Sequence, residues 1–218
     1  MNENETPILV APHMAHPWHG ISIGQRAPEV VAAFIEMVPT DTVKYEVDKR
    51  SGHLKIDRPQ KYSSQCPAPY GFLPQTYCGN RVGLFAGEKT DRSGIVGDGD
   101  PLDICVLSER TINHGGVLLF ARPIGGYRMF DGNEADDKIL AVLCDDPAYG
   151  AYSSITDCPR SLVERLRHYF LTYKDMPLQT GCRVEITDIY DVEEARHIIC
   201  LAQADYQAGF RVVAESPG

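Results

Sequence analysis

Short segments in which apolar and polar residues alternate dominate the first two thirds of the chain. Val43, Tyr45 and Val47 fall on one face of such a segment, and Lys44 and Glu46 fall on the other, as the two-residue period of a β-strand requires. The same reasoning predicts strands at residues 34–38, 43–47, 53–57, 103–107, 117–122, 124–129, 138–143 and 183–189. Several short strands separated by Gly, Asn and Asp turns favour a small closed barrel.

Helical periodicity is found only in the last third of the chain. The first expected helix covers residues 160–173 after Pro159, and its apolar stripe is formed by Leu162, Leu166, Tyr169, Phe170 and Tyr173. The second covers residues 192–207, with Asp191 as its N-cap, Glu194 three residues later and Gly209 as its stop signal. The pattern predicts an α+β protein that is mainly β, with two main helices near its C-terminus.

Two segments lack a clear period. Residues 1–30 are rich in Pro, His and Gly, and we expect an N-terminal arm on the domain surface, without an assigned function. Residues 79–97 form a Gly-rich, charged insertion between two strands, where we expect an extended surface excursion or flap. Because 218 residues suffice for one well-buried core, residues 31–218 are interpreted as a single domain.

The charge balance limits the class of partner. The chain has 21 basic and 30 acidic residues and a formal net charge of −9, so a nucleic-acid surface, which needs a basic stripe, is not expected. The seven cysteines contain no Cys-x-x-Cys pair, which argues against a disulfide framework and a zinc site. No basic segment precedes an apolar run, and no apolar stretch approaches about 18 residues. We therefore expect a soluble, cytoplasmic protein with buried thiols and no membrane contact.

Three carboxylates crowd into residues 98–103. Asp98, Asp100 and Asp103 stand directly before residues 104–107, which are expected to form a buried strand. Mutual repulsion would raise at least one of their pKa values unless a cation neutralised the cluster, and oxygen ligands suit a hard divalent ion such as Mg2+. A solvated turn is an alternative. A helix-loop-helix calcium site is excluded, because Asp103 occupies the position that requires Gly.

A second acidic loop, residues 131–138, also leads into an expected strand. If the two loops lie close together, at least five acids converge, and hard-cation sites can then share carboxylates as in phosphoryl chemistry. Basic residues lie beside acids or a tyrosine in four places: Lys44 near Glu46, Arg58 after Asp57, Lys138 after Asp137, and Lys174 after Tyr173. Diphosphate suits such a pocket, because its oxygens can bind metals on one side and Lys, Arg and Tyr donors on the other.

These motifs resemble the soluble, Mg2+-dependent inorganic pyrophosphatases of family I. The match covers residues 34–185, and its most specific part is the three-aspartate signature with Pro101 before the apolar residue. The other motifs follow in the family's order: residues 35–36, 44–48 and 57–58, Tyr70 twelve positions after Arg58, Asp131 with Asp136 and Lys138 five and seven positions later, and residues 173–175.

The resemblance implies an OB-like, five-stranded β-barrel with two main C-terminal helices packed outside. It implies hydrolysis of inorganic diphosphate to two orthophosphates, which drives biosynthetic reactions and supports phosphate metabolism, with about three to four Mg2+ ions per site. The implied metal-binding acids are Asp98, Asp103, Asp131, Asp136, Glu46 and Glu36. Among them, Asp98, Asp103 and Asp136 would be the main ligands of two activating ions, with Asp103 bridging them. Asp131 with Asp136 would hold a further ion, Glu46 would help to hold another through water, and Glu36 would orient waters.

The resemblance also implies catalytic roles. Asp100 is the implied general base, because a water shared between two divalent ions is strongly acidified and a carboxylate of ordinary basicity can accept its proton. The groups implied to hold the phosphates and stabilise leaving-group charge are Lys44, Arg58, Tyr70, Lys138, Tyr173 and Lys174. Lys44, Arg58 and Tyr70 are also counted as catalytic.

Some positions depart from the family pattern. Residues 66–69 read Cys-Pro-Ala-Pro where the family commonly has Tyr-Pro-x-Asn, and Thr180 stands where many members have Lys. Neither departure touches an implied metal ligand. Two alternatives stay open: a barrel that has lost catalysis and binds a ligand or partner, and a nucleic-acid-binding barrel, which the net charge opposes. Like compact bacterial members of the family, the protein is expected to be a homo-oligomer.

Overall fold

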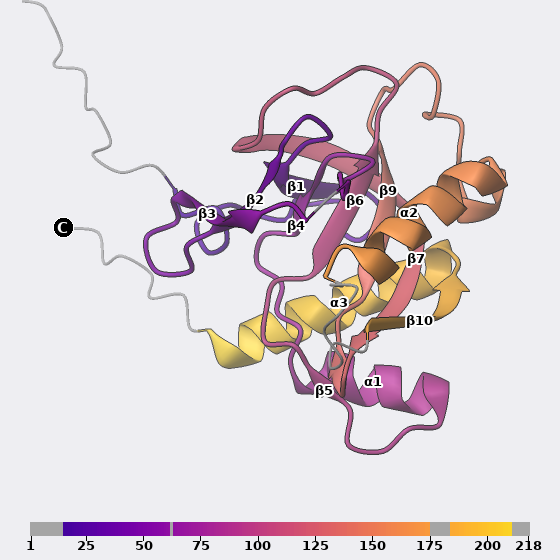
Figure 1. The fold of residues 1–218 in the computed structure, drawn as a ribbon. Helices are drawn as coiled ribbons and strands as arrows, with labels where there is room; N and C mark the ends of the chain where they lie inside the picture. The colour runs from indigo at the N-terminus through magenta and orange to yellow at the C-terminus, as the bar shows by residue number, and fades with distance from the viewer. Residues whose placement is uncertain (1–14, 62, 175–183, 211–218) are drawn as a thin grey trace, which may run out of the picture.

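The computed structural model describes residues 15–61, 63–174 and 184–210 (Figure 1). The strands in these residues are β1 (Val31–Met37), β2 (Val43–Val47), β3 (Leu54–Pro59), β4 (Tyr70–Phe72), β5 (Val96–Gly97), β6 (Asp103–Leu107), β7 (Val117–Asp131), β8 (Glu134–Ala135), β9 (Lys138–Leu143) and β10 (Val184–Tyr190). The helices are α1 (Asn80–Thr90), α2 (Arg160–Thr172) and α3 (Val192–Gly209), with a short 3-10 helix at Ile155–Asp157.

Five strands close into a ring. β1 pairs with β4, β4 with β6, β6 with β9, β9 with β7, and β7 again with β1. Within this ring β6 and β9 run parallel, and the other four pairs are antiparallel. The closed five-stranded barrel implied by the sequence resemblance is therefore confirmed. β10 extends the sheet along β7, and β2 and β3 form a separate two-stranded sheet.

The prediction of two separate strands at residues 117–122 and 124–129 is wrong, because both belong to the single strand β7. The register against β9 shifts between Pro123 and Gly125, since Pro123 has no N–H for the ladder and Gly125 adopts a positive φ of 152°. This irregularity disturbs the pairing without ending the strand. As a result β7 pairs with β1 in its first part and with β10 in its last part.

The flap expected at residues 79–97 is also wrong, because most of this insertion is helix α1. Val82 and Ala86, four positions apart, are buried, which is the spacing of a helix face. Gly83 packs on β5, and a Cβ added there would lie 2.6 Å from the Gly97 backbone nitrogen. In the sequence Gly83 suggests a loop, but in the structure it allows close contact between α1 and β5. The helix as a whole packs against α3 and β5 (Figure 1).

Both predicted C-terminal helices are confirmed. α2 follows Pro159 and packs on one apolar cluster of the barrel through residues such as Leu166 and Phe170. α3 packs on a second cluster through residues such as Ile198. The predicted cap of α3 is present, because the Asp191 carboxylate accepts a hydrogen bond from the Glu194 N–H at 3.0 Å.

The described part of the N-terminal arm packs against the barrel. Trp18 is buried in an apolar cluster with Phe34, Phe72 and Tyr206, and its Nε1 donates a hydrogen bond to the Thr76 carbonyl oxygen at 2.7 Å. Residues 1–14, which belong to the same predicted arm, lie outside the described residues. The arm is therefore fixed to the barrel at least from Trp18 onward.

Two other expectations concern the whole chain. The six described cysteines are free thiols, and four of them are buried; Cys182 lies outside the described residues. Among the helices that the structure describes, none has the length and the apolar composition needed to cross a bilayer.

We predict that Gly83→Ala destabilises the protein by about 1–3 kcal/mol, the usual cost of overpacking. The added methyl group would meet the backbone of Val96 and Gly97 at 2.6–2.8 Å, and this clash outweighs the helix propensity of about 1 kcal/mol that Ala gains over Gly. Urea unfolding measures the change. Gly209→Ala, at an open position at the end of α3, is the control and should not destabilise. Unchanged stability of Gly83→Ala would contradict the close packing of α1 on β5.

Candidate functional site

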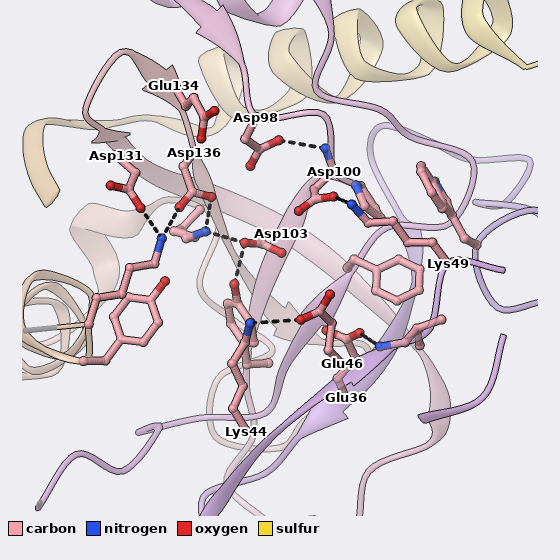
Figure 2. Close-up of a pocket in the computed structure, with 18 residues that line it drawn as sticks. Glu36, Lys44, Glu46, Lys49, Asp98, Asp100, Asp103, Asp131, Glu134 and Asp136 are labelled. Carbon is pink, nitrogen blue, oxygen red and sulfur yellow. Dashed lines mark hydrogen bonds and ion pairs between the residues drawn. The ribbon is translucent and has the colours of Figure 1, made fainter. Parts of the chain in front are cut away.

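A pocket of about 190 Å³ lies where the barrel meets β2 and the loops before β6 and β9 (Figure 2). The acids that line it are Glu36, Glu46, Asp98, Asp100, Asp103, Asp131, Glu134 and Asp136. The lysines and tyrosines that line it are Lys44, Lys49, Lys138, Lys174, Tyr70 and Tyr173. The structure thus brings together every candidate residue from the sequence except Arg58.

The strand pairing explains why residues distant in sequence meet. Asp103 begins β6 and Lys138 begins β9, and these two residues are direct partners in the parallel ladder. Asp131 ends β7, the strand that pairs with β9 on its other edge. Because side chains two positions apart in an extended chain share a face, Asp136 and Lys138 both reach the pocket.

Lys138 is the central cation of the pocket. Its side chain is 1% exposed, and its ammonium group donates hydrogen bonds to the carboxylates of Asp103 and Asp136. The Tyr70 hydroxyl donates to the same oxygen of Asp103. Burial alone would lower the pKa of Lys138, but the two carboxylates raise it well above its usual value. Lys138 is therefore a permanent ammonium group between two acids.

Two other acids are held toward their protonated forms. Burial, together with the neighbouring carboxylates of Asp136 and Asp103, raises the pKa of Asp98 far above its usual range. Burial also raises the pKa of Glu36 to about 8, although its carboxylate accepts a hydrogen bond from the Val47 N–H at 2.6 Å. At both acids burial is the main cause of the raised pKa, and at Asp98 the neighbouring carboxylates add to it.

Lys174 and Lys44 pair with acids at the two edges of the pocket. The Lys174 Nζ lies 2.7 Å from Asp131 Oδ2 and 3.6 Å from Asp136 Oδ2, and the Lys44 Nζ lies 3.5 Å from Glu46 Oε2. With ammonium groups between the carboxylates, no group of three acid, His or Cys side chains among the described residues forms a ready metal cage. The donor set itself, which is oxygen only, is the kind that binds hard divalent cations.

Arg58 is the one candidate residue that does not line the pocket. Its guanidinium carbon is 5.7 Å from the centre of the Tyr173 ring, and its Nε is 3.9 Å from Asp57 Oδ2. Its Nη1 is buried and has no hydrogen-bond partner among the described residues. Arg58 therefore packs beside a lining residue, Tyr173, without lining the pocket itself. Thr180, one of the departures from the family pattern, lies outside the described residues.

Six lining residues are absent from the candidates chosen on sequence: Trp18, Val47, Lys49, Phe72, Pro101 and Glu134. Lys49, at the turn after β2, pairs with Asp100 (Figure 2), and its position next to the 44–48 motif is a usable signal. Glu134 belongs to the second acidic loop, so it could have been included on the same grounds as Asp131. Trp18 comes from the arm, and nothing in the sequence links it to the pocket.

Comparisons with known proteins agree with this geometry. A family model described as "Inorganic pyrophosphatase" matches residues 33–207. The inorganic pyrophosphatase of Chlamydia muridarum is 49% identical over 207 residues, which cover 93% of this chain and 97% of that protein. That of Chlamydia caviae is 51% identical, with 93% and 94% covered. The crystal structure of the inorganic pyrophosphatase from Thermus thermophilus matches with a TM-score of 0.74 at 29% identity and covers 89% of this chain and 99% of its own.

We predict that Lys138→Met lowers the free energy of unfolding of the metal-free protein by about 3 kcal/mol or more, because it leaves two carboxylates without their buried cation. Denaturant unfolding measures this loss. Millimolar Mg2+ should recover part of it, because a ligand that binds only the folded state stabilises that state.

The control is Lys55→Met, which removes a half-exposed partner 4.0 Å from Asp48 and should leave stability nearly unchanged. If the two variants were equally stable, Lys138 would not have the compensating role described above.

Proposed function

The chain belongs to the inorganic pyrophosphatase family, and on this premise we propose that its pocket hydrolyses inorganic diphosphate to two orthophosphates by attack of a water molecule. The observation that carries the proposal is the convergence of six candidate metal-binding acids and five candidate phosphate-binding groups on one pocket. Diphosphate is small and highly charged, and it needs both kinds of group at once. A barrel that only binds a partner needs no such set, and no pocket residue favours that alternative.

The family requires a divalent metal ion, and we propose that here the ion is Mg2+, with about three to four ions per site. The residues that would hold these ions, directly or through water, are Asp98, Asp103, Asp131, Asp136, Glu46 and Glu36. Their oxygen donors suit Mg2+, and the acids that line the pocket outnumber its lysines. When bound, Mg2+ would neutralise the charge of these acids and that of the diphosphate and would make water more acidic.

Asp100 is the proposed general base, which accepts a proton from the attacking water. Its two acidic neighbours, Asp98 and Asp103, are assigned to the metal ions, so Asp100 is the carboxylate of this run that remains free to take the proton. Its side chain is 46% exposed, which lets the proton leave to solvent after each turnover. Its partner Lys49 holds the carboxylate at the rim of the pocket.

The groups proposed to bind the phosphates are Lys44, Lys138, Lys174, Tyr70 and Tyr173, with Arg58 packed beside Tyr173. Burial raises the pKa of both tyrosines, so each keeps its proton and can donate it in a hydrogen bond. Together with the ammonium groups they stabilise the charge that develops on the leaving orthophosphate. Arg58 is kept in this set because its buried Nη1 has no acceptor among the described residues, and a phosphate oxygen would supply one.

We also propose that the protein is a cytoplasmic homo-oligomer that serves phosphate metabolism. Cys66 and Cys105 interact with each other and are nevertheless free thiols, as suits a reducing compartment. Leu118 and Phe120, two positions apart on β7, are 45% and 53% exposed, and a second copy of the chain would cover them. Sedimentation velocity tests the assembly; a monomer at micromolar concentration would contradict it.

We expect the protein to release phosphate from diphosphate with Mg2+ present and to lose this activity with a chelator. Asp100→Asn keeps the shape of the side chain and removes the base, so kcat should fall by about 10²–10⁴-fold with a smaller change in KM. Asp188→Asn, which alters an exposed carboxylate on β10, is the matched control and should keep the full rate.

The two parts of this prediction can fail separately. Absence of Mg2+-dependent turnover in the unchanged protein would overturn the proposed function. Full activity of Asp100→Asn across the pH range would overturn only the assignment of the base.

Metal titration by calorimetry separates the roles of two further acids. Asp103→Ala should weaken Mg2+ binding more than Glu36→Ala, because Asp103 is assigned as a direct ligand, whereas Glu36 accepts the Val47 N–H and is assigned to orient waters. The reverse order of affinities would contradict both assignments.

A further inference from the structure

Arg128 of β7 is a buried cation that does not line the pocket. Its side chain is 1% exposed, and its Nη2 lies 2.8 Å from Glu194 Oε1 and 3.5 Å from Asp137 Oδ2. Its guanidinium carbon is 5.1 Å from the ring centre of Phe85 and 5.4 Å from that of Tyr190. Nε and Nη1 find no hydrogen-bond acceptor among the described residues, so the aromatic rings are the neighbours of this part of the cation.

Asp137 connects Arg128 to the pocket. The Asp137 side chain is buried and also accepts a hydrogen bond from the Met129 N–H at 3.3 Å. Its two neighbours, Asp136 and Lys138, line the pocket, whereas Asp137 does not, because successive side chains in extended chain point to opposite faces. Any rotation of the backbone at Asp137 would therefore displace both neighbours inside the pocket.

α1 and α3 hold Arg128 from outside. The sequence indicates Glu194 as part of the cap of α3, and its backbone N–H is indeed capped by Asp191. Its side chain turns instead to Arg128 and to Lys89, whose Nζ in the last turn of α1 lies 2.6 Å from Glu194 Oε2. The insertion thus supplies both an ammonium group and the Phe85 ring to the surroundings of Arg128.

The other end of α1 is also tied to α3. The buried carboxylate of Asp205 accepts hydrogen bonds from the N–H groups of Gly79, Arg81 and Val82, which are free donors at the start of α1. Between its two ends the helix packs on β5, and β5 pairs with β8. These two short strands lead directly to Asp98 and Asp136, respectively.

A buried ion network does not by itself imply a stabilising role, since apolar residues of similar volume often serve stability as well or better. An apolar residue in place of Arg128, however, would not fix the direction of the Asp137 carboxylate. We propose that Arg128 is a positioning residue, which through Asp137 fixes the orientation of the metal ligand Asp136 and of the phosphate-binding Lys138. This inference rests on the proposed function, from which the roles of Asp136 and Lys138 are taken.

The test separates positioning from stability. The double variant Arg128→Met/Asp137→Val replaces the buried pair with apolar side chains, so the fold should keep most of its thermal stability. Mg2+ binding, measured by calorimetry without substrate, should nevertheless weaken about 10-fold, the usual effect of losing a group that orients a ligand. The single variant Arg128→Lys keeps a cation beside Asp137, so it should retain most of the wild-type affinity for Mg2+. Wild-type Mg2+ affinity in the double variant would overturn the proposal.

Asp146→Ala is the matched control, because it removes a buried carboxylate that accepts hydrogen bonds from the N–H groups of Glu109 and Tyr149, beyond the end of β9 opposite to Lys138 and away from α1, Arg128 and Asp137. It should lower the melting temperature and leave Mg2+ affinity unchanged. An equal loss of affinity in this control would mean that general loosening, and not Arg128, governs the site, and would also overturn the proposal.

If the double variant does not fold, Glu194→Gln decides the question. Glu194 is partly exposed, and this variant removes the negative charge that pairs with Arg128. Mg2+ binding should weaken about threefold, which is less than the full effect of losing an orienting group. Unchanged Mg2+ affinity would overturn the proposal. The proposed function is tested separately, because an unchanged protein that binds Mg2+ and does not hydrolyse diphosphate would contradict the activity while leaving the affinity comparison intact.

Discussion

The ion pairs between Lys138 and the carboxylates of Asp103 and Asp136 are the interaction on which the pocket depends. A folded chain can keep several crowded acids ionised only if a cation lies among them, and Lys138 provides this cation from within the barrel. Asp103 and Lys138 are partners in the β6–β9 ladder, so the closed ring fixes their register. The closure of the barrel therefore also places the compensating cation beside the acid.

The fold could be predicted wherever the periodicity of the sequence fitted only one type of secondary structure. α3 follows from the cap at Asp191 and its apolar face, and the closed barrel follows from the succession of short strands together with the family motifs. The sequence does not reveal the helix at residues 80–90, because a glycine in close contact, such as Gly83, cannot be distinguished in a sequence from a glycine in a turn. β7 was divided at Pro123 because a proline in a strand usually marks its end, whereas here it accompanies a shift of register.

The candidate site was predictable because most of its residues lie at the ends of strands in motifs with fixed spacing. Asp98, Asp103 and Asp136 could be chosen on that basis before any coordinates. Trp18 and the partnership between Arg128 and Asp137 could not, since they depend on which elements pack together. Glu194 illustrates the difference well: the sequence correctly indicated the cap of a helix, but the side chain has a second role that only the packing reveals.

The insertion also shows how a barrel of this kind can change its length. α1 lies in the connection between β4 and β6, which are neighbours in the ring. Lengthening a connection between strands that already pair costs little, about 0.6 kcal/mol of closure entropy for each doubling. New chain can therefore be added at this point, and can come to rest against an existing helix, without altering the register of the strands that carry the acids. Chain length can therefore vary in the part of the connection before Asp98, while the pairing of β6 with β9 keeps Asp103 beside Lys138.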